Sequence, residues 1–443
     1  MDFRKLKIVL IKFSVKGTFY GLLFLAWFAF PVMSQGQNKT GTTEIDAITY
    51  DQYLKQEWKE LIKTSKEADR NGISFYYLDV RTGIAYYNLK KYRTAIKYLK
   101  KAYRSNQNNE YVNELLYYAY LFSGRANDAE KLKKDLHATL KKNMNIDTDP
   151  VFDAATFDFR FEINDDYTVT PADGEILTQS VRTGYKFFSF GVEQLTGRNQ
   201  LYYNYGRVIK KNNVYYYDST GTWPDGQAAE KQKIFQNQVY FDYGNQVADG
   251  LNVSAAFNWL NLVSIYETSA VKYTYNYIVG FLAVRKDFSN FKAGIFASVS
   301  NLERYFQFQP GAELTWYPFS NTNLYLHANV SYKMEQKDGK SYNELYFNPS
   351  IGVRLFTFYF EPSYTFGNIS NYVEADALII NNDNDLIKNR LNILTYGYLF
   401  KGKLNIYLKY QHFDKVNSYY LNTTEESITY KNNAYTLGIK WRF

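Results

Sequence analysis

The residues that could do chemistry in this sequence are charged and aromatic rather than nucleophilic. The chain has 443 residues, three His and no Cys. It contains no phosphate-binding glycine loop, no G-x-S-x-G elbow, no H-E-x-x-H helix and no Cys-based metal motif. His137 lies beside Leu136 in a helical region, where a structural role is expected, and His327 and His412 fall on opposite parities of different strands. We therefore expect no enzyme activity, no catalytic residue, no metal and no cofactor.

A second group of residues recurs on one parity of several segments after residue 240. Alternate residues of a strand point to opposite faces, so these side chains are expected to share one polar face. Two interpretations remain open: mutual ion pairs that fill and stiffen an interior, or a wall on which Tyr rings stack against sugars while mixed charges bind a polar polymer weakly. The candidates are Asp242, Lys292, Glu313, Tyr325, His327, Lys333, Arg354, Tyr359, Glu361, Lys409, Lys440 and Arg442.

The elements that must carry these residues are strands with one apolar face. The segments 251–259, 324–332 and 357–366 alternate apolar and polar residues, and so does the final stretch AYTLGIKWRF. The polar parity carries charges and amides, which the core of a sandwich would not tolerate unpaired. The apolar parity is therefore expected to meet lipid, and the polar parity a lumen. In the last strand the apolar parity consists of Tyr435, Leu437, Ile439, Trp441 and Phe443.

Connections between these strands are expected to be short at one rim and long at the other, as in outer-membrane barrels. The loop at 367–390 is the longest, and its apolar run from Ala377 to Ile380 favours folding inward as a constriction. The other long loops are expected at 335–341 and 414–433. Tight turns are expected at 244–250, 287–290, 318–321, 356–357 and 400–403.

The strand count follows from the same alternation. Eleven strands are counted back from Phe443 to about Lys231, and the segments 154–163, 177–188 and 199–210 add three. If the helical region and the C-terminus lie on the same side of a membrane, the number must be even. We expect fourteen strands, with twelve as the alternative if the first two segments are not strands. The expected fold is an α + β multidomain chain whose antiparallel up-and-down barrel spans 149–443.

Bulk composition is consistent with this layout. A mean hydropathy of −0.44 excludes a helical membrane protein with many spans but not a barrel, in which apolar and polar residues alternate. The net charge of +8 arises before residue 150, because residues 151–443 hold 27 Lys and Arg against 28 Asp and Glu. No nucleic-acid partner is therefore expected.

The first residues predict a targeting segment. Five basic residues precede an uncharged apolar stretch from Gly17 to Met33, and polar residues come after it. This pattern is typical of a secretory signal peptide over 1–34, cleaved after Ser34, with a linker over 35–44. The alternative is a retained anchor of about the minimum spanning length.

Residues 45–148 change to a helical composition rich in Lys, Glu, Ala and Leu. Within a 34-residue unit that starts at Tyr76, small and large residues recur at the positions where two antiparallel helices touch. The region resembles a tetratricopeptide array, with a second repeat in register and a degenerate one before it across 53–71. Such an array implies a docking face for a protein partner; the alternative is a spacer that packs against the strand-rich region. The positions that carry the resemblance are Gly83, Tyr86, Ala95, Leu99, Ala102, Tyr120 and Ala129.

The whole arrangement resembles the YaiO-like outer-membrane proteins, and it is similar to a shortened exopolysaccharide exporter for cellulose or poly-N-acetylglucosamine. The resemblance implies a Gram-negative outer membrane with lipid and lipopolysaccharide around the barrel, a periplasmic N-terminal domain with a protein partner, and passage of a polar polymer such as a polysaccharide. It also implies that the barrel assembly machinery recognises the terminal strand ending at Phe443. Two or three repeats are far fewer than those exporters use, so a non-conducting anchor for a periplasmic complex remains the alternative.

Overall fold

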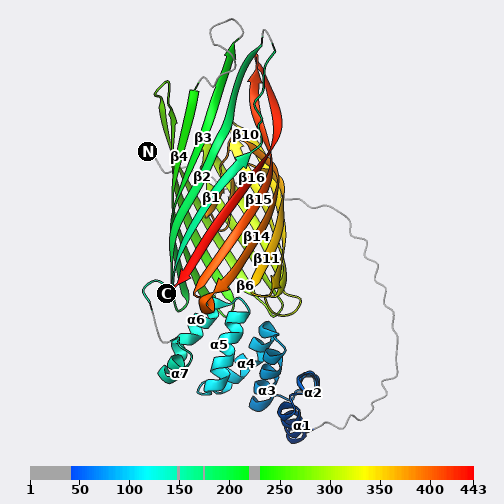
Figure 1. Cartoon of the computed structure of the whole chain (residues 1–443). Helices are drawn as coiled ribbons and strands as arrows, with labels where there is room; N and C mark the ends of the chain where they lie inside the picture. The colour runs from blue at the N-terminus through cyan, green and yellow to red at the C-terminus, as the bar shows by residue number, and fades with distance from the viewer. Residues whose placement is uncertain (1–40, 147–149, 173–174, 219–229) are drawn as a thin grey trace, which may run out of the picture. The chain divides into compact units, whose positions relative to one another are not determined.

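The computed structural model describes residues 41–146, 150–172, 175–218 and 230–443. The expected signal peptide, most of the linker and the expected domain boundary near 149 lie outside the described residues. Within these described residues, seven α-helices are followed by a closed antiparallel barrel of fourteen strands (Figure 1). The expected fold class is confirmed, and the alternative of twelve strands is wrong.

The helices form pairs that recur with a fixed period. The first members of the pairs begin at residues 42, 76 and 110 and the second members at 58, 92 and 126, so each pair starts 34 residues after the last. The first pair begins at Thr42, three residues before the expected start of the helical region at 45. No helix among the described residues is long and apolar enough to cross a membrane. The helices are α1 (Thr42–Leu54), α2 (Trp58–Arg70), α3 (Tyr76–Asn88), α4 (Tyr92–Ser105), α5 (Glu110–Phe122), α6 (Ala126–Asp135) and α7 (Ala138–Asn143).

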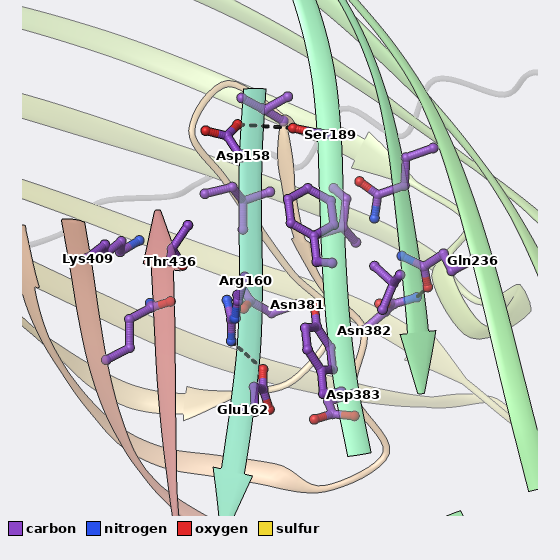
Figure 2. Close-up of a pocket in the computed structure, with 18 of the residues that line it drawn as sticks. Asp158, Arg160, Glu162, Ser189, Gln236, Asn381, Asn382, Asp383, Lys409 and Thr436 are labelled. Atoms are coloured by element: carbon purple, nitrogen blue, oxygen red, sulfur yellow. Dashed lines mark hydrogen bonds and ion pairs between the residues drawn. The ribbon is translucent and has the colours of Figure 1, made fainter. Parts of the chain in front are cut away.

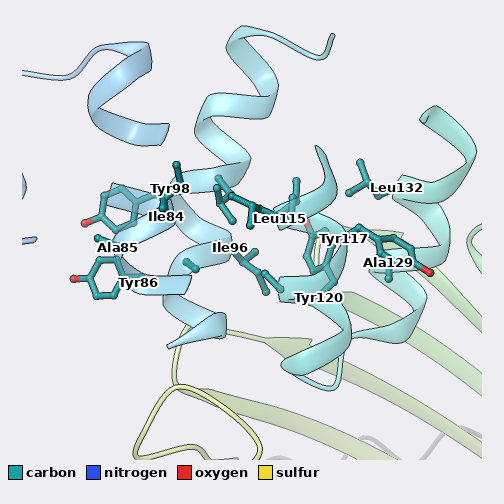
Figure 3. Close-up of a cluster of buried hydrophobic side chains, with 14 of the residues drawn as sticks. Ile84, Ala85, Tyr86, Ile96, Tyr98, Leu115, Tyr117, Tyr120, Ala129 and Leu132 are labelled. Atoms are coloured by element: carbon teal, nitrogen blue, oxygen red, sulfur yellow. The ribbon is translucent and has the colours of Figure 1, made fainter. Parts of the chain in front are cut away.

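Small residues allow α3 and α4 to pack closely. A Cβ atom at Gly83 would lie 2.7 Å from the Cδ2 atom of Leu99, so no larger residue fits there without displacing that side chain. Ala95 is fully buried, and the rings of Tyr86 and Tyr98 stack with centroids 5.5 Å apart. Figure 3 shows how this cluster continues through Leu115, Tyr117 and Tyr120 to Ala129 and Leu132. The helical region therefore has its own apolar core.

The barrel is an up-and-down sheet closed by its first and last strands. β1 and β16 pair from Ala154 opposite Arg442 to Asn164 opposite Asn432, and Figure 1 shows them side by side. The strands are β1 (Ala154–Asn164), β2 (Ile176–Thr196), β3 (Asn199–Asp218), β4 (Glu230–Ala248), β5 (Leu251–Tyr266), β6 (Lys272–Asp287), β7 (Phe291–Ser300), β8 (Phe306–Trp316), β9 (Leu324–Lys337), β10 (Lys340–Leu355), β11 (Phe358–Ile369), β14 (Leu386–Leu399), β15 (Leu404–Leu421) and β16 (Thr424–Arg442).

The outer face of the barrel exposes large apolar side chains from strand after strand. Leu282, Ile295, Leu345 and Leu408 each expose more than half of their surface. Soluble monomers rarely expose contiguous apolar patches above a few hundred Å². Exposed aromatic residues gather at the rim of the short turns, namely Phe288, Phe291, Trp316, Phe319, Phe356, Phe358, Phe400, Trp441 and Phe443.

Two of the expected long loops are strands. β9 and β10 are joined by the two-residue turn Asp338–Gly339, and β15 and β16 by Asn422–Thr423. Asp338, Gly339 and Asn422 have positive φ angles, as tight hairpin turns require. The sequences at 335–341 and 414–433 are polar because these strand ends carry polar side chains on both faces, which removes the alternation that marks a half-apolar strand.

Overpacking the α3–α4 contact tests the helical core. Replacing Ala95 with Trp should destabilise the helical region by about 1–3 kcal/mol, because the added ring has no space to enter. Thermal unfolding of the full chain, followed by helical circular dichroism, should show an earlier transition. Lys97→Trp, at an exposed position of the same helix, is the control. Equal transitions in both variants would show that the helix contact lies elsewhere.

Candidate functional site: a hairpin inside the barrel

The segment between β11 and β14 folds into the lumen, as the sequence predicts for the loop at 367–390. Residues 370–385, here called the luminal hairpin, contain the short paired strands β12 (Tyr372–Glu374) and β13 (Ile379–Asn381). They form a two-stranded sheet separate from the barrel sheet. Their side chains and carbonyls contact β2 to β6, β8, β9 and β14 to β16, so the hairpin crosses the interior of the barrel.

The tip of the luminal hairpin is held by an ion pair and two hydrogen bonds. The guanidinium of Arg285 on β6 donates two hydrogen bonds to the Asp376 carboxylate, at 2.6 and 2.8 Å. Tyr240 donates to the Asp376 carbonyl at 3.0 Å, and Asn258 donates to the Ala377 carbonyl at 2.8 Å. A bidentate Arg–carboxylate pair fixes orientation as well as charge.

The backbone of the tip is strained. Ala375, Asp376 and Ala377 have φ angles of 48°, 56° and 68°, in the left-handed region that non-glycine residues rarely adopt. Each such residue costs roughly 1–2 kcal/mol. Three in succession persist because the contacts of the seated tip hold them. Withdrawal of the tip would remove these contacts and release the strain.

The middle of the luminal hairpin combines apolar packing with backbone hydrogen bonds. Val373, Ala377 and Ile380 belong to one buried cluster with wall residues that include Leu260 and Phe281. The amide of Gln309 donates to the Val373 carbonyl at 2.8 Å and accepts from the Val373 N–H at 3.2 Å. Since these side chains lie inside the barrel, the apolar run predicted from the sequence packs against the lumen wall rather than against lipid.

Acidic residues fix the stems of the luminal hairpin. Asp383 accepts hydrogen bonds from Arg182 on β2, Lys210 on β3 and Lys415 on β15, with Lys415 at 3.0 Å. Glu374 forms a bidentate pair with Arg390 at 2.6 and 2.7 Å. The remaining acid, Asp385, accepts from Tyr430 at 2.6 Å and Asn417 at 2.8 Å.

Most of the expected luminal residues lie on the inner face, and several contact each other or the luminal hairpin. Lys333 donates to the Ser370 carbonyl at 2.6 Å, Glu313 accepts from Arg285 at 2.7 Å, and His327 is 2.9 Å from the Thr315 hydroxyl. The other contacts are Tyr325 with Glu361, Tyr359 stacked on Tyr396, and Lys440 with Glu193; Asp242, Lys292, Lys409 and Arg442 line cavities.

Arg354 and Asp242 differ from the other luminal candidates. Arg354 shares the inner parity of β10 and lies opposite Tyr359, but it is exposed at the rim, where its guanidinium donates to the Phe356 carbonyl in the turn. One carboxylate oxygen of Asp242 is buried without a hydrogen-bond partner. Within the described residues no group of three or more His, Asp or Glu is arranged to hold a metal ion.

The luminal hairpin leaves cavities on its two sides and beyond its tip. One cavity of about 170 Å³ lies against β1 to β4, β15 and β16, and part of its lining is shown in Figure 2. Another of about 270 Å³ lies against β6 to β11 and includes His327 and Glu361. A larger one of about 630 Å³ is lined by Asp376 at the tip and by residues of α5, α6 and the short-turn rim. The lumen is therefore interrupted rather than filled.

The helical region contacts the rim of short turns through a buried arginine. Arg93 at the start of α4 donates to the Asp287 carboxylate at 2.7 Å and to the carbonyls of Phe288, Ser289 and Ser123. Its guanidinium also lies 4.1 Å from the centroid of the Tyr317 ring. A buried guanidinium with this many acceptors is strongly oriented.

Further polar contacts connect the helices from α4 to α6 to the neighbouring short turns of the barrel. Asp249, in the turn between β4 and β5, accepts hydrogen bonds or ion pairs from Lys100 and Arg125. Partial burial opposes ionisation of this carboxyl, but the two cations outweigh it and hold its pKa below the ordinary value. Asp128 on α6 is hydrogen-bonded to Gln246 on β4.

The residues expected to form the assembly signal lie on the outer face of β16. Tyr435, Leu437 and Ile439 each expose about two fifths of their surface, and Trp441 and Phe443 continue the same face to the rim. Phe161 on β1 stacks on Tyr435 with centroids 5.3 Å apart. These residues are separate from the luminal hairpin. The repeat positions all lie in the helical core, where Leu99, Ala102, Tyr120 and Ala129 are buried.

The sequence interpretation missed the charges that hold the luminal hairpin. The stretch VEADALIINNDND contains four acidic residues, no basic residue and one apolar run. Such a loop needs cations from elsewhere if it folds into a low-dielectric interior. That composition was an available signal. The basic partners, Arg182, Lys210, Arg285, Arg390 and Lys415, are spread over five strands and could not be paired with it from spacing alone.

Comparison with solved structures finds general likeness to barrels. A Pseudomonas aeruginosa FadL homologue aligns over 66% of this chain and 90% of its own at 10% identity and a TM-score of 0.42. The Pseudomonas putida toluene transporter TodX aligns over 66% and 89% at 7% identity and 0.39. The translocator domain of the Neisseria meningitidis autotransporter NalP aligns over 73% and 100% at 10% and 0.30. No family model and no curated protein matches the sequence. Similarity at this level identifies neither a substrate nor a partner.

Removing the charge of Asp383 tests the stem contact. Asp383→Asn leaves Arg182 and Lys210 without their carboxylate, and breaking a buried pair in this way costs about 3–5 kcal/mol. Amide hydrogen exchange across 372–381 should become much faster, while exchange in the barrel strands stays slow. Asp338→Asn, in the exposed β9–β10 turn, is the control. Unchanged exchange across 372–381 would mean that the remaining contacts of the hairpin hold it without the Asp383 charge.

Proposed function

We propose that this protein is an outer-membrane barrel that forms a conduit for a polar solute or polymer, such as an exopolysaccharide, and rests closed with the luminal hairpin as its gate. The observation that carries the proposal is the ion-paired hairpin across a lumen that keeps open space on both sides. A barrel of fourteen strands is wide enough for an aqueous path unless something occupies it. In this barrel the luminal hairpin occupies that path, and it is held there by non-covalent contacts that can break.

The membrane location rests on the outer face. A closed barrel leaves no strand edge unpaired, which is what a hydrocarbon environment requires. Exposed Leu, Ile and Phe residues cover the strands, and aromatic residues gather at the short-turn rim, as at a lipid–water interface. An even number of strands places Ala154 and Arg442 at the same rim. Leu437 and its neighbours on β16 remain our candidates for recognition by the barrel assembly machinery.

The polar character of the solute rests on the inner face. The lumen carries Tyr rings, amides and paired charges, among them Tyr185, Gln236 and Arg160 beside the 170 Å³ cavity. Tyr faces suit stacking against sugar rings, and ion-paired walls bind polar chains weakly. An apolar solute would gain little from such a lining.

The helical region is proposed to lie in the periplasm and to bind a protein partner. It contacts the short turns, and short turns face the periplasm in barrels of this kind. The 34-residue period of the helix starts supports a tetratricopeptide array and, with the barrel, the resemblance to YaiO-like proteins. Exposed Tyr50, Tyr77 and Tyr111 on α1, α3 and α5 are the surface that a partner would cover.

The alternative function is a non-conducting anchor for a periplasmic complex. The contacts of Arg93 and Asp249 favour it, because they fix the helices to the barrel as a rigid scaffold would need. Under this alternative the luminal hairpin is a permanent filling rather than a gate.

Conductance distinguishes the two functions. Purified wild-type protein in a planar bilayer should show low conductance, and replacement of residues 370–385 by a four-residue Gly/Ser turn should raise it several-fold. Ile369 and Ile387 are still paired in β11 and β14, so a short turn can join these strands. Shortening the β5–β6 connection at 267–271 is the control and should change nothing.

If the hairpin-deleted form is as silent as the wild type, other side chains close the lumen and the anchor function is the better description. If the wild type already conducts freely, the luminal hairpin is not the gate and a general porin describes the protein better.

A charge on the outer face tests the membrane location. Leu437→Arg should lower folding stability in lipid by about 2–4 kcal/mol if this residue lies near the middle of the bilayer. Leu437 pairs with Phe159 and Leu408 in a wholly apolar stretch. Urea titration of the refolded barrel in liposomes measures the change. Glu426→Arg, near the far end of the same strand, should have little effect, and a small effect at both positions would contradict a lipid-facing β16.

A further inference from the structure

The cavity of about 170 Å³ beside the luminal hairpin has the size of a site for one small ring. A protein cavity of about 150 Å³ holds benzene. The walls come from β1 to β4, β15 and β16 on one side and from residues 378–383 of the hairpin on the other. Figure 2 shows Lys409 and Thr436 at one end of this space and Gln236 at the other.

The lining is part apolar and part polar. Phe187 and Val208 from the barrel and Ile380 from the hairpin offer apolar surface. Hydrogen-bonding groups come from both sides of the cavity, and one of them, Gln236, is bonded to Asn382 of the hairpin at 2.7 Å. Such a mixed lining suits a ring with polar substituents.

The charges around the cavity are paired with one exception. Asp158 accepts hydrogen bonds from Ser189 and Tyr407, and Arg160 forms an ion pair with Glu162, as the dashed lines of Figure 2 mark for Ser189 and Glu162. The hairpin carboxylate, Asp383, has its three cations.

Lys409 is the exception. Its ammonium lines the cavity, and within the described part of the chain it has no hydrogen-bond or ion-pair partner. The carboxylates of Glu374 and Glu361 attract this ammonium at longer range, and the guanidinium groups of Arg390 and Arg160 repel it. Leaving an ammonium unpaired in an interior is costly. A carboxylate that entered the cavity would supply the missing partner.

We propose that this cavity binds a six-membered ring that bears one carboxylate, with Lys409 pairing the carboxylate and Phe187 and Val208 contacting the ring. Sugar acids and aromatic acids share this chemistry. The inference goes beyond the proposed conduit, because a binding site requires no open path through the barrel. Its failure and a failure of conduction are therefore separate results.

The test is a titration of purified full-length protein in detergent micelles, monitored by saturation-transfer difference NMR. Glucuronate and benzoate are the carboxylate probes, and glucose and benzamide are their neutral counterparts. At least one carboxylate should bind at least tenfold more tightly than its neutral counterpart, and the stronger of the two identifies the ring type. This comparison on the wild type needs no variant.

Variants assign the preference to one residue. Lys409→Met should remove the carboxylate preference, Lys409→Arg should keep it, and Lys431→Met, at an exposed position of β16, should behave as the wild type. Heat-modifiable mobility checks that each variant folds. The proposal is overturned if neither carboxylate binds better than its neutral counterpart, or if folded Lys409→Met keeps the preference.

Discussion

Pairing of β1 with β16 is the contact on which the rest of the structure depends. In lipid every backbone N–H and C=O group must find a partner within the protein, and only closure of the sheet provides partners for the two outermost strands. Closure also fixes which parity of each strand faces inward. A polar interior is then unavoidable, since the outward parity has to be apolar. The structure must therefore satisfy many polar side chains in a confined space.

The luminal hairpin and the barrel wall provide ion-pair partners for each other. Arg285, Arg390 and Arg182 project inward from strands far apart in the barrel, and each has its carboxylate on the hairpin. Without the hairpin, Arg182 and Arg390 would lose the carboxylates they pair with, and Arg285 would keep its pair with Glu313. Without these cations, burial of the hairpin acids would be uncompensated. Because an ion pair in a partly wet interior is close to balanced between desolvation and attraction, the seated state is specific without being irreversible. The three left-handed residues at its tip shift that balance further toward release.

Sequence reasoning recovered the elements whose signal is local. The alternation in 154–163 and 177–188 was enough to place β1 and β2, and the 34-residue spacing of small residues located the helix pairs. It failed where both faces of a strand are polar, so the ends of β15 and β16 were expected to be a loop. It also could not pair Arg182 with Asp383, which are 201 residues apart. Such a pair exists only once the barrel is closed and the hairpin lies inside it.

The luminal hairpin is attached to the barrel at both ends, and this attachment determines how strongly it competes with a solute for the lumen. Residues 370–371 and 382–385 are the only links between its two short strands and the barrel strands β11 and β14. The hairpin therefore acts as a tethered ligand, whose effective concentration at its own binding site is in the mM range or above for links this short. Reseating is unimolecular, so its rate is independent of the amount of protein in the membrane. If the barrel is the conduit proposed above, a solute that holds the lumen open must outcompete this local concentration, and weak individual contacts are then sufficient to restore the closed state once the solute has left.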